Sequence, residues 1–116
     1  EPIRTKADFN QALKIIEEKP LPIAKHHKSR KKKIHDRWLI GSLESRAELL
    51  RDLYGRLKLK KLSFSEKEMM AKVREYFISE WLITDQSLSR KQARKRLRAA
   101  LKISVKKGRK DRKKEE

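Results

Sequence analysis

Apolar residues recur three and four positions apart in four stretches of the chain, which is the spacing of amphipathic helices. The first stretch predicts a helix over 6–18, because Thr5 and Asp8 stand at its start with capping-box spacing. Pro20 and Pro22 end this helix, since proline lacks a backbone N–H group and disfavours a helical residue before it. The chain therefore begins with a short amphipathic helix followed by a proline-containing turn.

A second apolar stripe, from Leu43 to Leu57, predicts the main core helix. Gly55 lies near its end and lowers helix stability by about 1 kcal/mol relative to alanine, so we expect fraying there. Apolar and basic residues alternate in the segment 58–64, but a single strand would have no partner. We therefore predict a basic connector rather than a strand.

A third helix is predicted to begin at Ser65, which forms a capping box with Glu68. Its apolar stripe includes Met70 and ends near Trp81. Tyr76 and Trp81 are possible platforms for stacking on bases, but aromatic residues at helical spacing more often belong to a core. We assign both rings to the core.

The fourth stretch, 89–102, combines a narrow apolar stripe with many Lys and Arg residues and contains no acidic residue. Ser89 and Gln92 give it a capping-box start. Like charges three and four positions apart destabilise an isolated helix, so contacts outside this helix must offset the repulsion. The residues after Ile103 form a low-complexity charged tail, which we expect to be disordered in the free protein.

These elements predict an all-α fold, a small bundle of four amphipathic helices. We expect a single helical domain over 1–103, because a chain of 116 residues has no room for a second core. Within it, a basic linker at about 19–37 has too few apolar residues to fold on its own contacts. The remaining residues, 104–116, form the charged flexible tail.

The charge balance favours a polyanionic partner. Lys and Arg total 34 against 16 acidic residues, a net charge of +18, and such a domain repels itself unless a polyanion is bound. An anionic membrane is the alternative to nucleic acid, but no apolar run approaches the roughly 20 residues of a spanning helix. The absence of cysteine is compatible with a reducing compartment. We expect an intracellular protein, cytoplasmic if its source is prokaryotic.

Three histidines in the basic linker raise the question of a metal site. His26, His27 and His35 have no neighbouring cysteine or glutamate that would complete a ligand set, and adjacent histidines bind one metal poorly. Solvated imidazoles that gain charge near phosphate are the simpler interpretation. We therefore expect no metal and no cofactor.

The candidate nucleic-acid contacts are Lys and Arg side chains in three basic segments. Phosphate contacts position a protein, whereas Asn and Gln, which read bases, are scarce in these segments. This predicts binding of DNA or RNA with little sequence specificity. The candidate residues are Lys28, Arg30, Lys31, Lys32, Lys33, Arg37, Lys58, Lys60, Lys61, Arg90, Lys91, Arg94, Lys95, Arg98 and Lys102.

No catalytic constellation is present in the sequence, which lacks a glycine-rich phosphate loop, a cysteine nucleophile and the HExxH and GxSxG motifs. We therefore expect no enzymatic activity. A ribosomal or organellar ribosomal protein that binds rRNA fits the composition. A helix-turn-helix DNA-binding protein with its turn at 85–88 is another alternative, although that turn lacks glycine. A protein-only adaptor, whose basic surface docks an acidic partner, is a third.

The second half of the chain resembles one known family. VREYFISEWL, followed after a short turn by LSRKQARKRLRAAL, resembles over 70–101 the small helical subunit of type I-D CRISPR effector complexes, the C-terminal part of their large subunit. The resemblance implies a non-catalytic helical subunit of a nucleoprotein complex that stacks with copies of itself. Such a subunit lines the path of the target or displaced strand, and Arg90, Arg94, Lys95 and Arg98 would contact phosphates.

Overall fold

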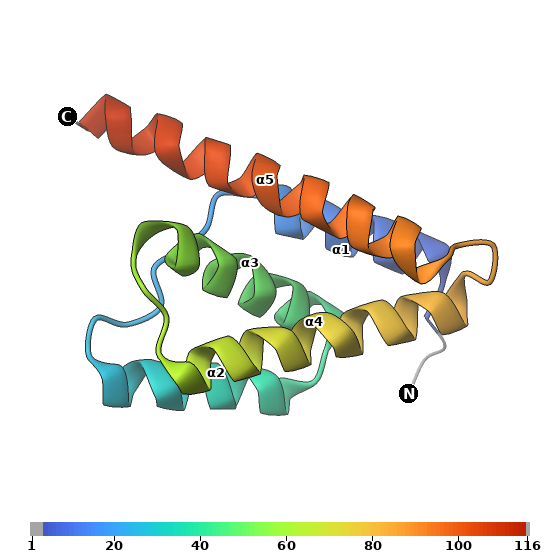
Figure 1. Cartoon of the computed structure of the whole chain (residues 1–116), viewed down its shortest axis with the longest axis horizontal. Helices are drawn as coiled ribbons and strands as arrows, with labels where there is room; N and C mark the ends of the chain where they lie inside the picture. Colours follow the sequence, from blue (N-terminus) through green and yellow to red (C-terminus); the bar gives the residue numbers. More distant parts are fainter. Residues whose placement is uncertain (1–3, 116) are drawn as a thin grey trace.

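Five α-helices make up the described part of this computed structural model, which covers the backbone of residues 4–115 and the side chains of residues 4–110 (Figure 1). No strand occurs in that range. The all-α prediction is confirmed, with five helices in place of the expected four. In chain order they are α1 (Lys6–Glu17), α2 (His27–Ile40), α3 (Leu43–Leu59), α4 (Phe64–Thr84) and α5 (Arg90–Glu115).

The predicted helices correspond to α1, α3, α4 and α5, and two of their predicted caps are confirmed. The Thr5 hydroxyl accepts from the Asp8 N–H while the Asp8 carboxylate accepts from the Thr5 N–H. Ser89 and Gln92 exchange the same pair of bonds at the start of α5, at 3.1 and 2.9 Å. Local capping chemistry therefore sets the starts of both helices.

The start of α4 differs from the prediction. Ser63 and Glu66 form its capping box, two residues before the expected pair Ser65 and Glu68. Both pairs have the required spacing, but only the observed one points a carboxylate inward, where Glu66 is buried against Arg30. A long-range ion pair therefore selects the frame of the cap.

The prediction of a basic linker at about 19–37 is wrong over most of that range, because residues 27–40 form α2. Arg30 and Ile34 are buried, Trp38 is partly buried, and Gly41 ends the helix with a φ of 74°. The buried face of α2 thus consists of one arginine and few apolar residues. The spacing of apolar residues in the sequence does not reveal such a helix. Tertiary contacts stabilise this helix, as they do most helices in proteins.

The prediction of a flexible tail is also wrong for residues 104–115, because these residues continue α5. Residue 116 of the predicted tail lies outside the described range. Ser104 is buried and donates to the Glu18 carbonyl at 2.5 Å. Gly108 is buried beside Pro20. The end of α1 and the turn after it therefore hold the helix well beyond the predicted boundary.

The core lies around α3, which packs against α1, α2, α4 and α5 (Figure 1). At one end three buried rings form a cluster, with Phe9 stacked on Trp81 at 6.0 Å and edge-on to Phe77 at 5.5 Å. The core assignment of Trp81 is confirmed. Tyr76 instead lies at the surface, 44% exposed. No described helix has the length and apolar character needed to cross a membrane.

Candidate nucleic-acid interface

A groove between α2 and the start of α4 collects basic side chains. We call it the α2 groove, and its volume is about 400 Å³. Its cationic side chains, Lys28, Lys31 and Lys32, are exposed and have no acidic partner among the described residues. The remaining lining residues are Ile34, His35, Ser65, Glu66 and Met69.

A buried ion pair lies beneath this groove. The Arg30 guanidinium donates from Nε to the Glu66 carboxylate, and from Nη1 to the carbonyls of Ala24 and Lys25 at 3.2 and 3.0 Å. Glu66 also accepts from the Ser63 N–H at 2.8 Å. One arginine thus joins the segment before α2 to the cap of α4, and it fixes both walls of the groove.

The surroundings of Glu66 favour its charged form. Burial raises the pKa of this carboxyl, but the hydrogen bonds from Ser63 and Arg30 outweigh it and hold the pKa below the ordinary value of 4.5. Since the folded-state pKa is the lower one, ionised Glu66 stabilises the fold above pH 4.5. This stabilisation is lost as the pH falls through the lower, folded-state pKa.

A pH series tests this linkage. The free energy of unfolding is measured by urea denaturation for the wild type and for Glu66→Gln, which keeps an oxygen acceptor for the Ser63 N–H. We expect the wild type to be the more stable near neutral pH, and the difference to shrink as the pH falls below 4.5. The other carboxyl groups contribute equally to the pH dependence of both proteins, so their contribution cancels in the difference. A difference that stays constant into the acid range would contradict the ionised state of Glu66.

The other predicted residues of this segment have different surroundings. Arg30 is 6% exposed and paired with Glu66, so it is a structural residue rather than a phosphate contact. Arg37 donates to the buried Asp52 at 2.7 Å. Lys33 is exposed but does not line the α2 groove.

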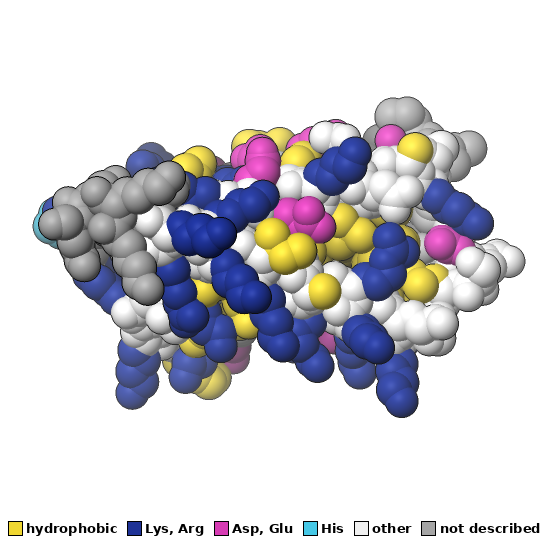
Figure 2. Space-filling model, turned by 90° about the horizontal axis from the view of Figure 1, so that it is seen from above, with side chains coloured by type: hydrophobic (Ala, Val, Ile, Leu, Met, Phe, Trp, Pro, Cys, Tyr) yellow, Lys and Arg dark blue, Asp and Glu magenta, His cyan; other side chains and the backbone are white. Residues whose placement is uncertain are grey.

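The basic residues of α5 fall into two groups. Arg90 and Arg94 reach towards Glu75 of α4, at 2.8 and 3.6 Å, although both remain about half exposed. The other predicted residues are exposed and have no acidic partner among the described residues. They are Lys91, Lys95, Arg98 and Lys102. Arg98 also lines a groove of about 400 Å³ together with Arg94 and Glu75. Figure 2, which views the molecule from the α5 side, shows Lys and Arg side chains beside the C-terminal part and along one edge of this face.

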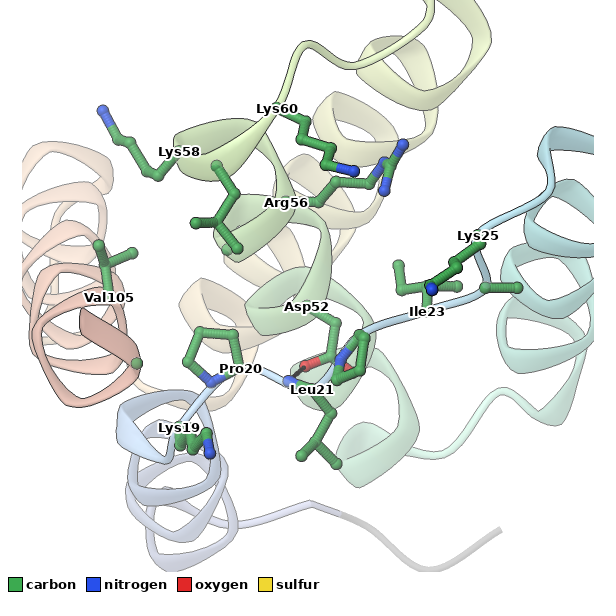
Figure 3. A pocket seen from close by; sticks show the side chains of 15 residues that line it. Lys19, Pro20, Leu21, Ile23, Lys25, Asp52, Arg56, Lys58, Lys60 and Val105 are labelled. Atoms are coloured by element: carbon green, nitrogen blue, oxygen red, sulfur yellow. Dashed lines mark hydrogen bonds between the residues drawn. The ribbon is translucent and has the colours of Figure 1, made fainter. Parts of the chain in front are cut away.

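The predicted contacts near the end of α3 lie elsewhere. Lys58 and Lys60 border a separate groove of about 620 Å³ beside the turn that joins α1 to α2 (Figure 3). Lys61 is exposed in the next connector. In the groove the Asp52 carboxylate accepts from the Leu21 N–H at 2.9 Å, so the turn is tied to α3. The structure therefore does not unite all fifteen candidates into one site.

Pro20 of this turn lies between α3 and α5, against a glycine of each helix (Figure 3). A Cβ atom on Gly55 would stand 2.5 Å from the Pro20 Cβ, whereas one on Gly108 would stand 3.3 Å from the Pro20 Cδ. The expectation that Gly55 marks a fraying point is wrong. Gly55 lies within α3 and is buried against Pro20. Its lack of a side chain leaves room for the proline ring.

Gly55→Ala tests this contact. Overpacking costs about 1–3 kcal/mol, and a Cβ atom only 2.5 Å from the Pro20 Cβ places this substitution in the upper part of that range, above the gain of about 1 kcal/mol in helix propensity. We expect the free energy of unfolding, measured by urea denaturation, to fall by about 1–2 kcal/mol. Gly108→Ala is the matched control and should show a smaller change. A Gly55→Ala variant as stable as the wild type would refute this role of the glycine.

The histidines do not form a metal site in the described part of the chain, where no cluster of three or more potential ligands occurs. His26 and His35 are exposed, and the His27 Nδ1 lies 3.4 Å from Arg30 Nη2. Three acidic residues near the basic surfaces, Asp52, Glu66 and Glu75, are instead engaged with arginine. The arrangement can therefore hold anions through ammonium and guanidinium groups.

Comparison with protein families matches residues 11–98 to the CarD C-terminal domain. The match spans most of the 116-residue chain and includes α2, α3 and α4. The chain belongs to the CarD C-terminal domain family. No curated protein and no solved structure gives a match.

The predicted relationship to the small subunit of type I-D CRISPR complexes is wrong, because the chain matches the CarD family instead. That resemblance rested on 70–101, a region in which the CarD model accounts for residues up to 98. Two amphipathic helices joined by a short turn occur in many helical folds, so this layout identifies no family.

Sequence reasoning missed the second wall of the α2 groove in this CarD domain. Ser65 and Met69 of α4 line it, and Phe64 beside them is 77% exposed. Nothing in the spacing of these residues links them to α2. The one available signal was Arg30 itself, because a single arginine among lysines suits a buried hydrogen-bonded pair better than lysine does.

Proposed function

We propose that this chain is a non-catalytic domain that binds the phosphate backbone of duplex DNA through the α2 groove, within a transcription-associated protein. The family match supports a role in transcription, in which the partner is DNA itself or RNA polymerase. The excess of positive charge supports a polyanionic ligand.

The observation that carries this proposal is the state of the lysines in the α2 groove. Lys28 and Lys32 stand one helical turn apart, Lys31 lies beside them, and all three are exposed without an acidic partner among the described residues. The ion pair of Arg30 and Glu66 holds the helix that carries them. Ammonium groups on a fixed helix neutralise phosphates without ordering a loop first.

Weak sequence specificity follows from the same side chains. Lysine is a point charge that suits phosphate, whereas base recognition uses bidentate Arg, Asn or Gln. Among the residues that line the α2 groove there is no free arginine and no amide side chain. We therefore propose that this surface positions the domain on DNA and that sequence selection lies elsewhere.

Lys32→Glu tests the assignment, with Lys14→Glu as its control. Lys14 is exposed on α1, so its reversal changes the net charge equally, away from the α2 groove. The amide resonances of α2, followed by NMR during titration with a duplex, give the dissociation constant of this surface alone. Since reversal replaces an attraction by a repulsion, we expect Lys32→Glu to weaken binding about tenfold.

Lys14→Glu should leave the dissociation constant at α2 unchanged. Equal effects of the two variants would mean that net charge alone governs binding and would reject the α2 groove. The absence of any shift at α2 on addition of duplex would reject the proposed function.

A further inference from the structure

The outer face of α5 carries a second row of unpartnered cations. Its members recur every three or four residues over eighteen positions, which corresponds to about 27 Å of helix. All are exposed and have no acidic partner among the described residues. We call them the α5 ridge: Lys91, Lys95, Arg98, Lys102, Lys106 and Arg109.

The helix under this ridge is anchored as far as Gly108. Its opposite face is buried, from Ala93 and Leu97 near the start to Ser104 and Gly108 near the end. The family match ends at residue 98, so half of the ridge lies beyond the matched domain. The ridge is therefore a fixed feature of this chain that the family match does not account for.

The α5 ridge and the α2 groove lie on opposite sides of the molecule. α3 packs against both helices, and Figure 1 shows α2 and α5 on either side of it, along the direction in which the Cα atoms span 29 Å. Charges are screened over about 8–10 Å at physiological salt. Each surface therefore attracts a polyanion independently of the other.

One short duplex does not reach both surfaces. Duplex DNA has a persistence length of about 150 base pairs, so bending a site of 20–30 base pairs by 40–90° costs about 1–6 kcal/mol. A straight duplex along the α5 ridge lies on the far side of α3 from the α2 groove. Simultaneous occupation therefore requires two separate segments.

The chemistry of the ridge favours nucleic acid over a membrane. An amphipathic helix binds lipid through an exposed apolar face, whereas the apolar stripe of α5 is buried against α1 and α3. A duplex presents one negative charge per about 1.7 Å of its axis, so it offers a phosphate within reach of every ridge residue. A straight row of cations matches this continuous charge.

From this geometry we infer that the domain has two DNA-binding surfaces and bridges two duplex segments. One segment occupies the α2 groove and the other lies along the α5 ridge. The inference rests on the proposed function for the first segment and adds the second. It assigns to the end of α5 the task of holding a distant stretch of DNA near the first.

Energy transfer between two duplexes tests the bridge. The probe is a duplex of about 16 base pairs, twice the length that the ridge covers. One sample of it carries the donor and a second sample carries the acceptor, and both are mixed with the full chain. We expect energy transfer when the duplexes are in excess. It should disappear when the protein is in excess, because each duplex then occupies its own chain. Sedimentation velocity should show one chain with two duplexes.

Two matched double variants separate the surfaces. Lys95→Glu/Arg98→Glu alters the ridge and Lys28→Glu/Lys32→Glu alters the α2 groove, and both exchange exposed residues. Each variant should lose energy transfer yet still bind one duplex per chain, with the helical circular-dichroism signal retained. Lys14→Glu should keep the energy transfer.

The outcomes distinguish the two proposals. A wild type that binds one duplex at α2, with no energy transfer, overturns the bridge and leaves the proposed function standing. Energy transfer that survives in the ridge variant, or a complex with two chains for two duplexes, also overturns it. Failure of the α2 resonances to shift overturns the proposed function instead.

Discussion

Replacing Glu66 with alanine is expected to lower the free energy of unfolding by about 3–5 kcal/mol, because it leaves the buried guanidinium of Arg30 without its counter-charge. Arg30 is 6% exposed, so water cannot readily replace the lost carboxylate. The substitution also removes the acceptor for the Ser63 N–H at the start of α4. Urea denaturation followed by circular dichroism measures the loss.

A double-mutant cycle separates the ion pair from the cap. Arg30→Met/Glu66→Ala lacks both charges, so we expect it to lose less stability than the sum of the two single variants. The cap is missing from both Glu66→Ala and the double variant, so its contribution cancels in the cycle. Strict additivity would mean that the two side chains do not stabilise each other.

The second large effect concerns DNA affinity. Lys28→Glu/Lys32→Glu reverses two charges that face the same groove, and we expect the affinity of the α2 surface for a duplex to fall about a hundredfold. The fold should persist, because both side chains are exposed and have no acidic partner among the described residues. NMR titration of the α2 resonances measures the affinity, and unchanged chemical shifts in the core confirm the fold.

A substitution on the same helix supplies a control. Lys33 is exposed on α2 but does not line the groove, so Lys33→Glu should weaken binding far less than Lys32→Glu. A Lys33→Glu effect as large as that of Lys32→Glu would show that the whole helix, rather than the groove, attracts DNA.

The helices that local chemistry specifies were predictable from the sequence. Ser89 and Gln92 cap α5, and Thr5 and Asp8 cap α1, through bonds between residues three apart. The apolar stripe of α3 was equally clear, since its members face one core. These signals lie within a single turn or a single face, so no knowledge of other elements is needed.

The features that depend on distant partners were not predictable. The ion pair with Glu66 makes Arg30 the buried anchor of α2, and the same pair selects Ser63 as the cap of α4. Likewise, the helical end of α5 depends on contacts of Ser104 and Gly108 with the turn after α1. The sequence separation in each case exceeds the range over which helical periodicity carries information.

The candidate site was partly predictable for the same reason. Excess charge pointed to Lys28, Lys31 and Lys32, which the structure brings together. Charge alone did not separate them from Arg30 and Arg37, whose guanidinium groups engage Glu66 and Asp52. Only the three-dimensional arrangement shows which cations remain free.

The salt dependence of DNA binding at α2 tests most directly whether Lys28, Lys31 and Lys32 neutralise phosphates. If each lysine neutralises one phosphate, the logarithm of the association constant should fall with the logarithm of salt concentration at a slope of about −3. Lys28→Ala/Lys32→Ala should bring the slope to about −1. The same slope in the wild type and the variant would mean that Lys28 and Lys32 do not neutralise phosphates.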